Sequence, residues 1–140
     1  MRSFSFEGRR VLLGRLEKGQ DILQGLTEFC VSKAVTAGSI QALGAVQRGA
    51  VGFYDQDSAS YREIGFDEEM EIASLAGNIS RREGETFLHC HIILANRDGR
   101  CFGGHLLEGN VAFACEFAIT ELEGAVPERT HDQATGLMLW

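Results

Sequence analysis

The chain has little proline and no long apolar segment. One proline stands against 17 glycines in 140 residues, which excludes a proline-rich linker between domains. The apolar runs at 92–95 and 111–115 are far shorter than the roughly 20 residues that a membrane-spanning helix needs. Residues 1–7 are not followed by the apolar stretch typical of a secretory signal. We therefore expect a cytoplasmic protein that does not cross a membrane.

Positive charge is also scarce. The chain has 13 Lys and Arg against 20 Asp and Glu, which gives a formal net charge of −7. An acidic protein repels a polyanion at long range. Direct DNA binding is therefore not expected.

The remaining composition is ordinary for a globular protein. Apolar residues make up 44% of the chain and charged residues 24%, which excludes wholesale disorder, a collagen-like fibre and a coiled coil. No internal repeat or interdomain linker divides the sequence, and its length suits one core. We predict a single domain over residues 1–140.

The cysteines form no C-x-x-C pair. All of them lie in apolar-rich segments, whereas secreted disulfide frameworks are usually denser and occur in shorter chains. The pattern predicts reduced thiols in the core at Cys30, Cys90, Cys101 and Cys115.

One segment has clear helical periodicity. Its apolar residues repeat at three- and four-residue spacing, at Ile22, Leu23, Leu26, Phe29, Cys30 and Ala34. Asp21 is well placed as the N-cap, and Gly38 is expected to end the helix.

Most other segments predict strands. After a first strand or hairpin within 4–16, β-rich runs follow at 40–43, 46–54, 61–66, 70–79, 86–95, 101–106 and 111–122. Turn sequences at 55–58 and 96–99 favour hairpins. The run 111–122 also fits helical spacing, but its alternation favours a strand. The predicted fold class is α/β (α+β), a mixed and mainly antiparallel sheet with one main helix.

Three of the four histidines lie close together in the sequence, at His89, His91 and His105. Residues two apart on a strand point to the same face, so His89 and His91 present two imidazoles side by side while Cys90 faces away. The turn at 96–99 returns the next strand beside the first. His105 is therefore expected on the same face.

Three imidazoles on one face suit zinc, which commonly has three protein ligands and an open position in catalytic sites. Glu108 and Glu116 are the nearby acids available as a fourth ligand, a partner of a ligand or a general base. Gly103 and Gly104 are expected to remove side-chain bulk beside the site. A His-x-His pair alone is more often a solvated polar pair, and the third histidine favours the metal site. His131, in a polar stretch, is expected at the surface.

An ordered series of motifs carries a family resemblance. The series contains residues 16–21 before the helix, Glu-Ile-Ala-Ser-Leu-Ala-Gly at 71–77, His-x-His at 89–91, Gly-Gly-His-Leu-x-Glu-Gly at 103–109 and Thr-Gly-Leu at 135–137. It resembles the PPC domain (DUF296) in its stand-alone prokaryotic form. The resemblance spans nearly the whole chain.

The resemblance implies a mixed, mainly antiparallel sheet and a homotrimer. Its suspected metal ligands correspond to His89, His91 and His105. Plant PPC domains follow AT-hooks, whose Arg-Gly-Arg-Pro core binds the minor groove. The one proline here, Pro127, follows Val126, so the sequence contains no AT-hook. The family's name as a predicted DNA-binding protein therefore transfers poorly to this chain.

The implied fold is also similar to that of acetolactate decarboxylase, a zinc enzyme whose ligands include a comparable His-x-His and a later histidine. Two functions are left open: a trimeric binding and assembly module, with or without metal, for a small-molecule ligand, and a zinc-dependent, decarboxylase-like lyase acting on a small oxo-acid. Direct DNA binding is a third alternative, which the acidic charge disfavours. Turnover that a chelator abolishes would select the lyase.

Overall fold

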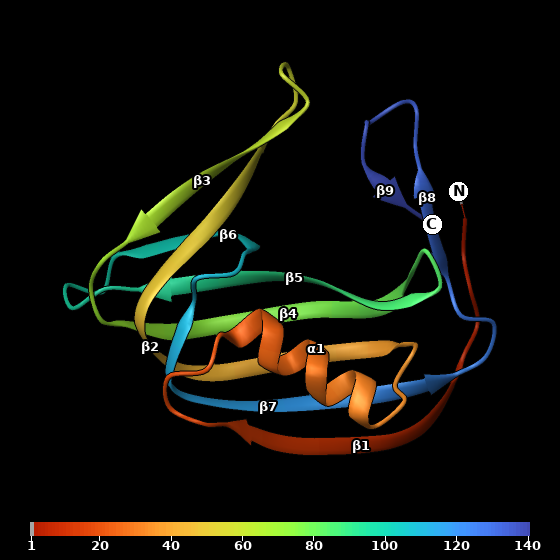
Figure 1. The fold of residues 1–140 in the computed structure, drawn as a ribbon, viewed down its shortest axis with the longest axis horizontal. Helices are drawn as coiled ribbons and strands as arrows, with labels where there is room; N and C mark the ends of the chain where they lie inside the picture. The colour runs from red at the N-terminus through yellow and green to blue at the C-terminus, as the bar shows by residue number, and fades with distance from the viewer. Residues whose placement is uncertain (1) are drawn as a thin grey trace.

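Strands make up most of the chain (Figure 1). The computed structural model describes residues 2–140 and contains, in chain order, β1 (Glu7–Leu16), α1 (Ile22–Ser32), β2 (Gly38–Asp55), β3 (Ser60–Phe66), β4 (Met70–Arg82), β5 (Glu85–Ala95), β6 (Cys101–Leu106), β7 (Val111–Glu123), β8 (Glu128–His131) and β9 (Met138–Leu139). Alternating residues explain the strands. In β5, Cys90 and Ile92 are buried, while His91 between them is exposed on the other face.

The long strand β2 organises the sheet. Its first part pairs with β7 on one side and β4 on the other, and its second part pairs with β3 and, at Val51 and Gly52, with β6. Since β4 also pairs with β5, and β5 with β6, these strands and β2 complete a ring. Within residues 2–140, only β4 and β8 pair in parallel. The structure confirms the predicted mixed, mainly antiparallel sheet with one helix.

Helix α1 packs its apolar side on the sheet. Asp21 is the N-cap, as predicted, and its carboxylate accepts a hydrogen bond from the backbone N–H of Gln24 at 3.0 Å. The core joins the helix to the inward residues of the strands, with fully buried side chains at Ile22, Leu26, Ile40, Leu75, Ile92, Leu94, Leu106 and Ile119.

The helix ends earlier than predicted. Its last residue is Ser32. Ala34 takes the positive φ, 55°, that was expected of Gly38 at the end of the helix. Gly38 instead begins β2. A Cβ there would lie 2.6 Å from the carbonyl oxygen of Thr120, so this glycine serves strand packing.

The strand predictions need two corrections. The runs 40–43 and 46–54 belong to one strand, β2, with an irregularity in its pairing at Gly44, which has a φ of 144°. The run 111–122 is strand β7, as predicted, and not the alternative helix. Strands β8 and β9 were missed because both are very short, and β8 contains no apolar residue.

The cysteine prediction holds for three of the four positions. Cys30, Cys90 and Cys115 are buried free thiols, and burial raises their pKa values to between about 11 and about 12. Cys101 is also free but exposed, because it begins β6 directly after a surface turn.

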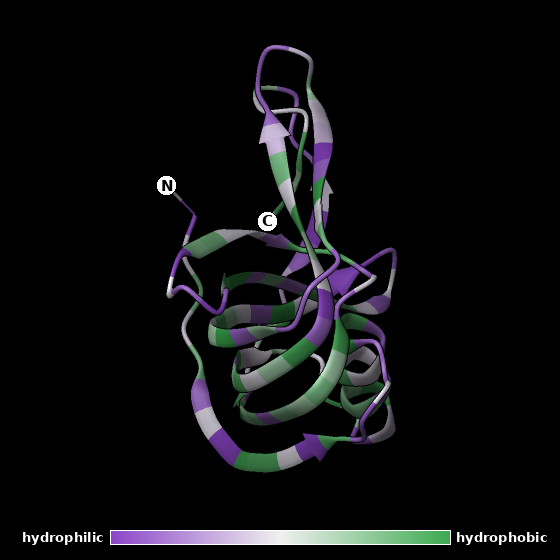
Figure 2. Cartoon of the chain, turned by 90° about the vertical axis from the view of Figure 1, so that its left-hand side faces the viewer, coloured by the Kyte–Doolittle hydropathy of each residue, from purple (hydrophilic) through white to green (hydrophobic). Residues whose placement is uncertain are grey.

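Two hairpins project from the sheet and leave a space between them. The β2–β3 hairpin extends beyond the other strands (Figures 1 and 2), and the segment with β8 and β9 lies across from it. The hydroxyl of Tyr54 in β2 donates a hydrogen bond to the carbonyl oxygen of Thr135 at 2.9 Å, which connects the hairpins. Within residues 2–140, every helix is too short or too polar to span a bilayer.

Candidate metal centre

Strands β5 and β6 bring three histidines together, as predicted. The chain reverses at Asn96, whose side-chain oxygen accepts from the backbone N–H of Arg100 at 3.0 Å. This turn places His105 directly across from His91 in the strand register. The ring centroids are 5.4 Å apart for His89 and His91, 4.9 Å for His89 and His105, and 5.5 Å for His91 and His105.

The three imidazoles could hold a metal ion. One nitrogen of each ring lies within 4.8 Å of the other two. Zinc binds imidazole nitrogen at about 2.0–2.1 Å, which places ligand nitrogens roughly 3.4 Å apart in a tetrahedral site, so the rings would have to turn inward. Cys90 is 1% exposed and points into the core, so its thiol is directed away from the cluster.

The surroundings of the rings favour neutral imidazole. Burial, followed by the charges of His105, Arg129 and His91, lowers the pKa of His89 to about 4. Burial also lowers the pKa of His105, with smaller contributions from His91 and Arg129. Neutral imidazole is the form that coordinates a metal, so both rings are prepared for binding at neutral pH.

Two of the histidines line a cavity of about 580 Å³ between the hairpins. His89 and His105 come from the central strands, Tyr54 and Tyr61 come from the β2–β3 hairpin, and Arg129 comes from β8. The ring of Tyr61 packs against His105 with 5.1 Å between centroids. The cavity can therefore hold a small molecule in contact with the histidine cluster.

The two candidate acids lie in different places. Glu108 lines the same cavity as the histidines, near Leu23 of α1. Glu116 lies on β7, which is separated from β5 by β2 and β4, and it lines another concavity with Leu13 and Leu43. Of the two acids, the structure brings only Glu108 to the histidine cavity.

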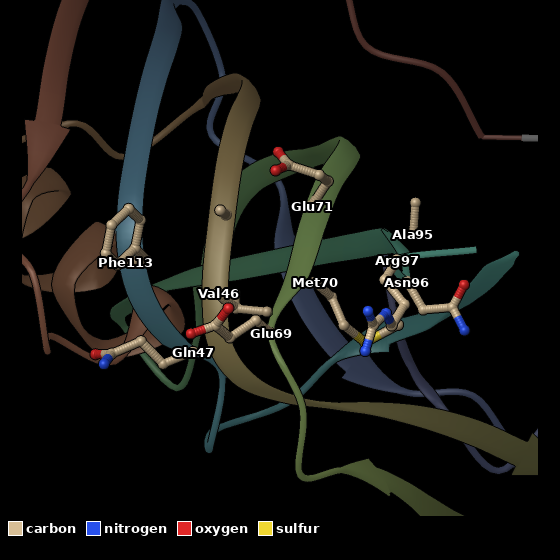
Figure 3. A pocket seen from close by; sticks show the side chains of 10 residues that line it. Val46, Gln47, Glu69, Met70, Glu71, Ala95, Asn96, Arg97 and Phe113 are labelled. Carbon is tan, nitrogen blue, oxygen red and sulfur yellow. The ribbon is translucent and has the colours of Figure 1, made fainter. Parts of the chain in front are cut away.

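A further concavity of about 330 Å³ lies where β4 begins and β5 ends (Figure 3). Its lining includes Glu69, Glu71 and Arg97 but no histidine or cysteine. It lacks the nitrogen and sulfur ligands that zinc prefers. Metal chemistry is therefore supported at the histidine cavity.

Gly103 and Gly104 have a different role from the predicted one. A Cβ at Gly104 would lie 2.5 Å from the carbonyl oxygen of Gly52 in β2, and a Cβ at Gly103 would lie 3.3 Å from that of Ile92 in β5. The two glycines let neighbouring backbones approach β6. They act on the cluster by fixing the position of His105, which follows them.

Arg129 is a buried charged residue of the cavity that the sequence did not predict, and the exposed Arg82 also lines the cavity. Arg129 is 5% exposed, and its side chain donates to Ser80 Oγ at 2.8 Å, to Asn78 Oδ1 at 2.8 Å and to the Met138 carbonyl oxygen at 2.9 Å. Asn78 pairs with His89 across β4 and β5, so the guanidinium lies beside the cluster. Burial lowers the pKa of Arg129.

Local sequence gives no sign of this arginine. Two of its acceptors lie 49 and 51 residues earlier in the chain. The one useful signal is Thr-Gly-Leu at 135–137, because this motif belongs to the segment that borders the cavity. His131 is exposed, as predicted.

Comparison with known proteins gives consistent matches. The family model of the Plants and Prokaryotes Conserved (PCC) domain matches residues 3–123. A metal-containing protein from Archaeoglobus fulgidus is 40% identical, with a TM-score of 0.95 and coverage of 100% of this chain and 99% of that chain. A plant- and prokaryote-conserved (PPC) protein from Pyrococcus horikoshii is 34% identical, with a TM-score of 0.93 and coverage of 100% and 96%.

A curated relative is much longer. The bifunctional protein GlmU of Synechococcus sp. (strain JA-3-3Ab) is 29% identical over 131 residues, which cover 92% of this chain. The match covers 20% of GlmU, so the chain spans about one fifth of that protein's length. The family match over most of the residues and the shared fold agree with the motif series: this chain belongs to the Plants and Prokaryotes Conserved (PCC) domain family.

Proposed function

We propose that this protein is a zinc-binding, homotrimeric module that takes up a small ligand beside its metal. The observation that carries the proposal is the cluster of His89, His91 and His105 next to a cavity of about 580 Å³. Three imidazoles leave a fourth zinc position free for a ligand or water. The description of the Archaeoglobus relative as metal-containing, at 40% identity, supports the metal. Four free thiols agree with the reducing cytoplasm that we propose as its location.

Metal content of matched variants tests the site. Zinc should co-purify with the wild type at about one ion per chain, and His91→Ala should lose tight binding because two imidazoles and water make a poorer site. Cys90→Ser should keep its zinc, since the thiol points into the core. Elemental analysis measures both. Unchanged metal in His91→Ala, or loss of metal in Cys90→Ser together with a native fold, would contradict the assignment.

An exposed apolar sheet face supports the homotrimer. Leu13 is 78% exposed, Leu43 59% and Phe113 53%, on the neighbouring strands β1, β2 and β7. Exposed apolar side chains on neighbouring strands are typical of a protein–protein contact, and β1 is an edge strand that a second copy would cover. Light scattering should give three times the chain mass of 15.3 kDa. A monomer mass at micromolar concentration would exclude the trimer.

A zinc-dependent lyase acting on a small oxo-acid is the second candidate. Glu108 favours it, because a carboxylate that lines the same cavity as the histidines is available for proton transfer. Zinc-loaded protein would then release CO₂ from 2-acetolactate, and a chelator would abolish the release. Glu108→Gln should lose turnover but keep metal, whereas Glu116→Gln should keep both. An absence of turnover with this and other small oxo-acids would favour the binding module.

A further inference from the structure

Arg129 is a buried cation without an anionic partner. It is 5% exposed, and all three of its hydrogen-bond acceptors are neutral: a hydroxyl, a side-chain amide oxygen and a carbonyl oxygen. Among residues 2–140, no carboxylate oxygen lies within 4.0 Å of this guanidinium, so it forms no ion pair there. A buried charge is costly to fold unless it is paired. The position therefore calls for a negative charge that the described chain does not supply.

The guanidinium is held in one orientation. Its central carbon lies 5.2 Å from the centroid of the Phe87 ring and 4.2 Å from that of Trp140. Its hydrogen bonds to Ser80 and Asn78 prevent it from rotating between the rings. Three of the five N–H groups of the guanidinium donate hydrogen bonds, which leaves one further N–H on each terminal nitrogen. A fixed fork with free donors is suited to a carboxylate, and its order reduces the entropy lost on binding.

The same cavity brings the guanidinium beside a proposed metal ligand. Arg129 and His89 both line it, and Asn78 links them, because it accepts from Arg129 and pairs with His89 in the strand register. A divalent ion on the histidines would add a second positive centre beside the guanidinium. An anion that contacts both would relieve their repulsion.

The cavity walls limit the kind of anion. Tyr61, Phe87, Leu107 and Leu139 give it aromatic and apolar surface, and Arg129 is its one buried cation. The carboxylate of Glu108 in the same lining repels a dianion such as phosphate more strongly than a monoanion. We propose that this cavity binds a small monocarboxylic acid whose carboxylate pairs with Arg129, a ligand assignment that rests on the metal module proposed above.

A purely structural role for Arg129 predicts different behaviour. In that case the guanidinium only anchors residues 138–140 to β4 through Met138 and Trp140. Ligand charge would then have no effect on binding. The experiment must therefore vary the charge of the ligand as well as that of the protein.

Calorimetric titration of the zinc-loaded protein with pyruvate is the test, with its neutral amide, pyruvamide, as the matched ligand. Wild type should bind pyruvate at least about tenfold more tightly than pyruvamide. Arg129→Gln should lose that preference and retain its zinc. Arg97→Gln is the matched control, because Arg97 lies in the separate concavity (Figure 3) and its loss should change nothing.

Several outcomes would overturn the proposal. It is wrong if Arg129→Gln binds pyruvate like wild type, or if inorganic phosphate binds more tightly than pyruvate. If Arg129→Gln does not fold, metal-free Arg82→Gln decides, because Arg82 also lines the cavity, and a preference for pyruvate over pyruvamide that persists without zinc and without Arg82 belongs to Arg129. An equal affinity there refutes the assignment. Failure of the metal proposal is separate, since it is read from zinc content and not from pyruvate binding.

Discussion

Among the three clustered histidines, His89 has a pKa far below its ordinary value. Burial and the charges of His105, Arg129 and His91 hold its pKa at about 4, so protons compete with a metal for this ring at lower pH than the ordinary value near 6.5 implies. Metal affinity should therefore fall at a lower pH for this ligand than it would for an ordinary histidine.

The same shift makes the stability of the metal-free protein depend on pH. As pH falls from about 6.5 towards about 4, His89 takes up a proton in the unfolded chain but not in the folded one. The unfolded state then binds more protons, so the free energy of unfolding should decrease over that window. Denaturant unfolding at pH 7 and pH 5 measures this. His89→Gln should reduce the pH dependence, whereas His131→Gln, at an exposed position, should leave it unchanged.

The sequence predicts the histidines far better than it predicts the rest of the cavity. Strand alternation and one turn suffice to bring His89, His91 and His105 together, because their separations are local. Arg129 reaches the cavity through contacts with β4 across 49 and 51 residues of chain. The alternation of a four-residue strand is too short to show which of its residues faces inward.

At the level of elements, the contact of β6 with β2 positions the third ligand. Only Val51 and Gly52 of β2 pair with β6, and Gly52 lies opposite His105. Asn110, fully buried just beyond β6, donates to the Ala50 carbonyl oxygen at 2.8 Å and accepts from the Ala50 N–H at 3.2 Å. This side chain continues the pairing where the strand has ended, so the short contact is reinforced.

Gly104→Ala tests this contact. The added Cβ would lie 2.5 Å from the Gly52 carbonyl oxygen, so β6 must move away from β2 and carry His105 with it. We expect a loss of about 1–3 kcal/mol in the free energy of unfolding, by analogy with overpacked cores, and weaker zinc binding. Thermal unfolding and zinc titration measure the two effects. Gly65→Ala in β3 is the control, because its Cβ would enter open space. Equal zinc affinity in both variants would show that the contact of β6 with β2 does not position a metal ligand.

Element prediction succeeded where pattern and length agree. The β-rich run 101–106 after the turn at 96–99 gives β6 with the observed bounds. Asp21 begins the helix because its side chain satisfies a free backbone N–H. Prediction failed where tertiary contacts decide. The helix ends at Ser32 although the next glycine is Gly38, and the sequence contains no local pattern that specifies the conformation of Ala34.

For the whole molecule, the distribution of charge matters as much as its sum. Arg9 and Arg10 on the edge strand β1 both bond to Glu121, and Arg15 lies 3.5 Å from Glu17. Arg129 is buried. The protein therefore has a formal net charge of −7, and three of its arginines already form ion pairs with its own carboxylates.

This charge arrangement predicts weak interaction with DNA. Phosphate contacts supply most of the non-specific affinity for a duplex, and each one requires an available Lys or Arg. With 13 basic against 20 acidic residues, and with no AT-hook sequence, we expect no specific duplex binding and only weak association that disappears as salt rises. A gel-shift titration at low salt and at about 200 mM salt measures this. A shifted band at nanomolar protein that survives the higher salt would contradict the prediction, because it would require phosphate contacts strong enough to overcome the repulsion from a net charge of −7.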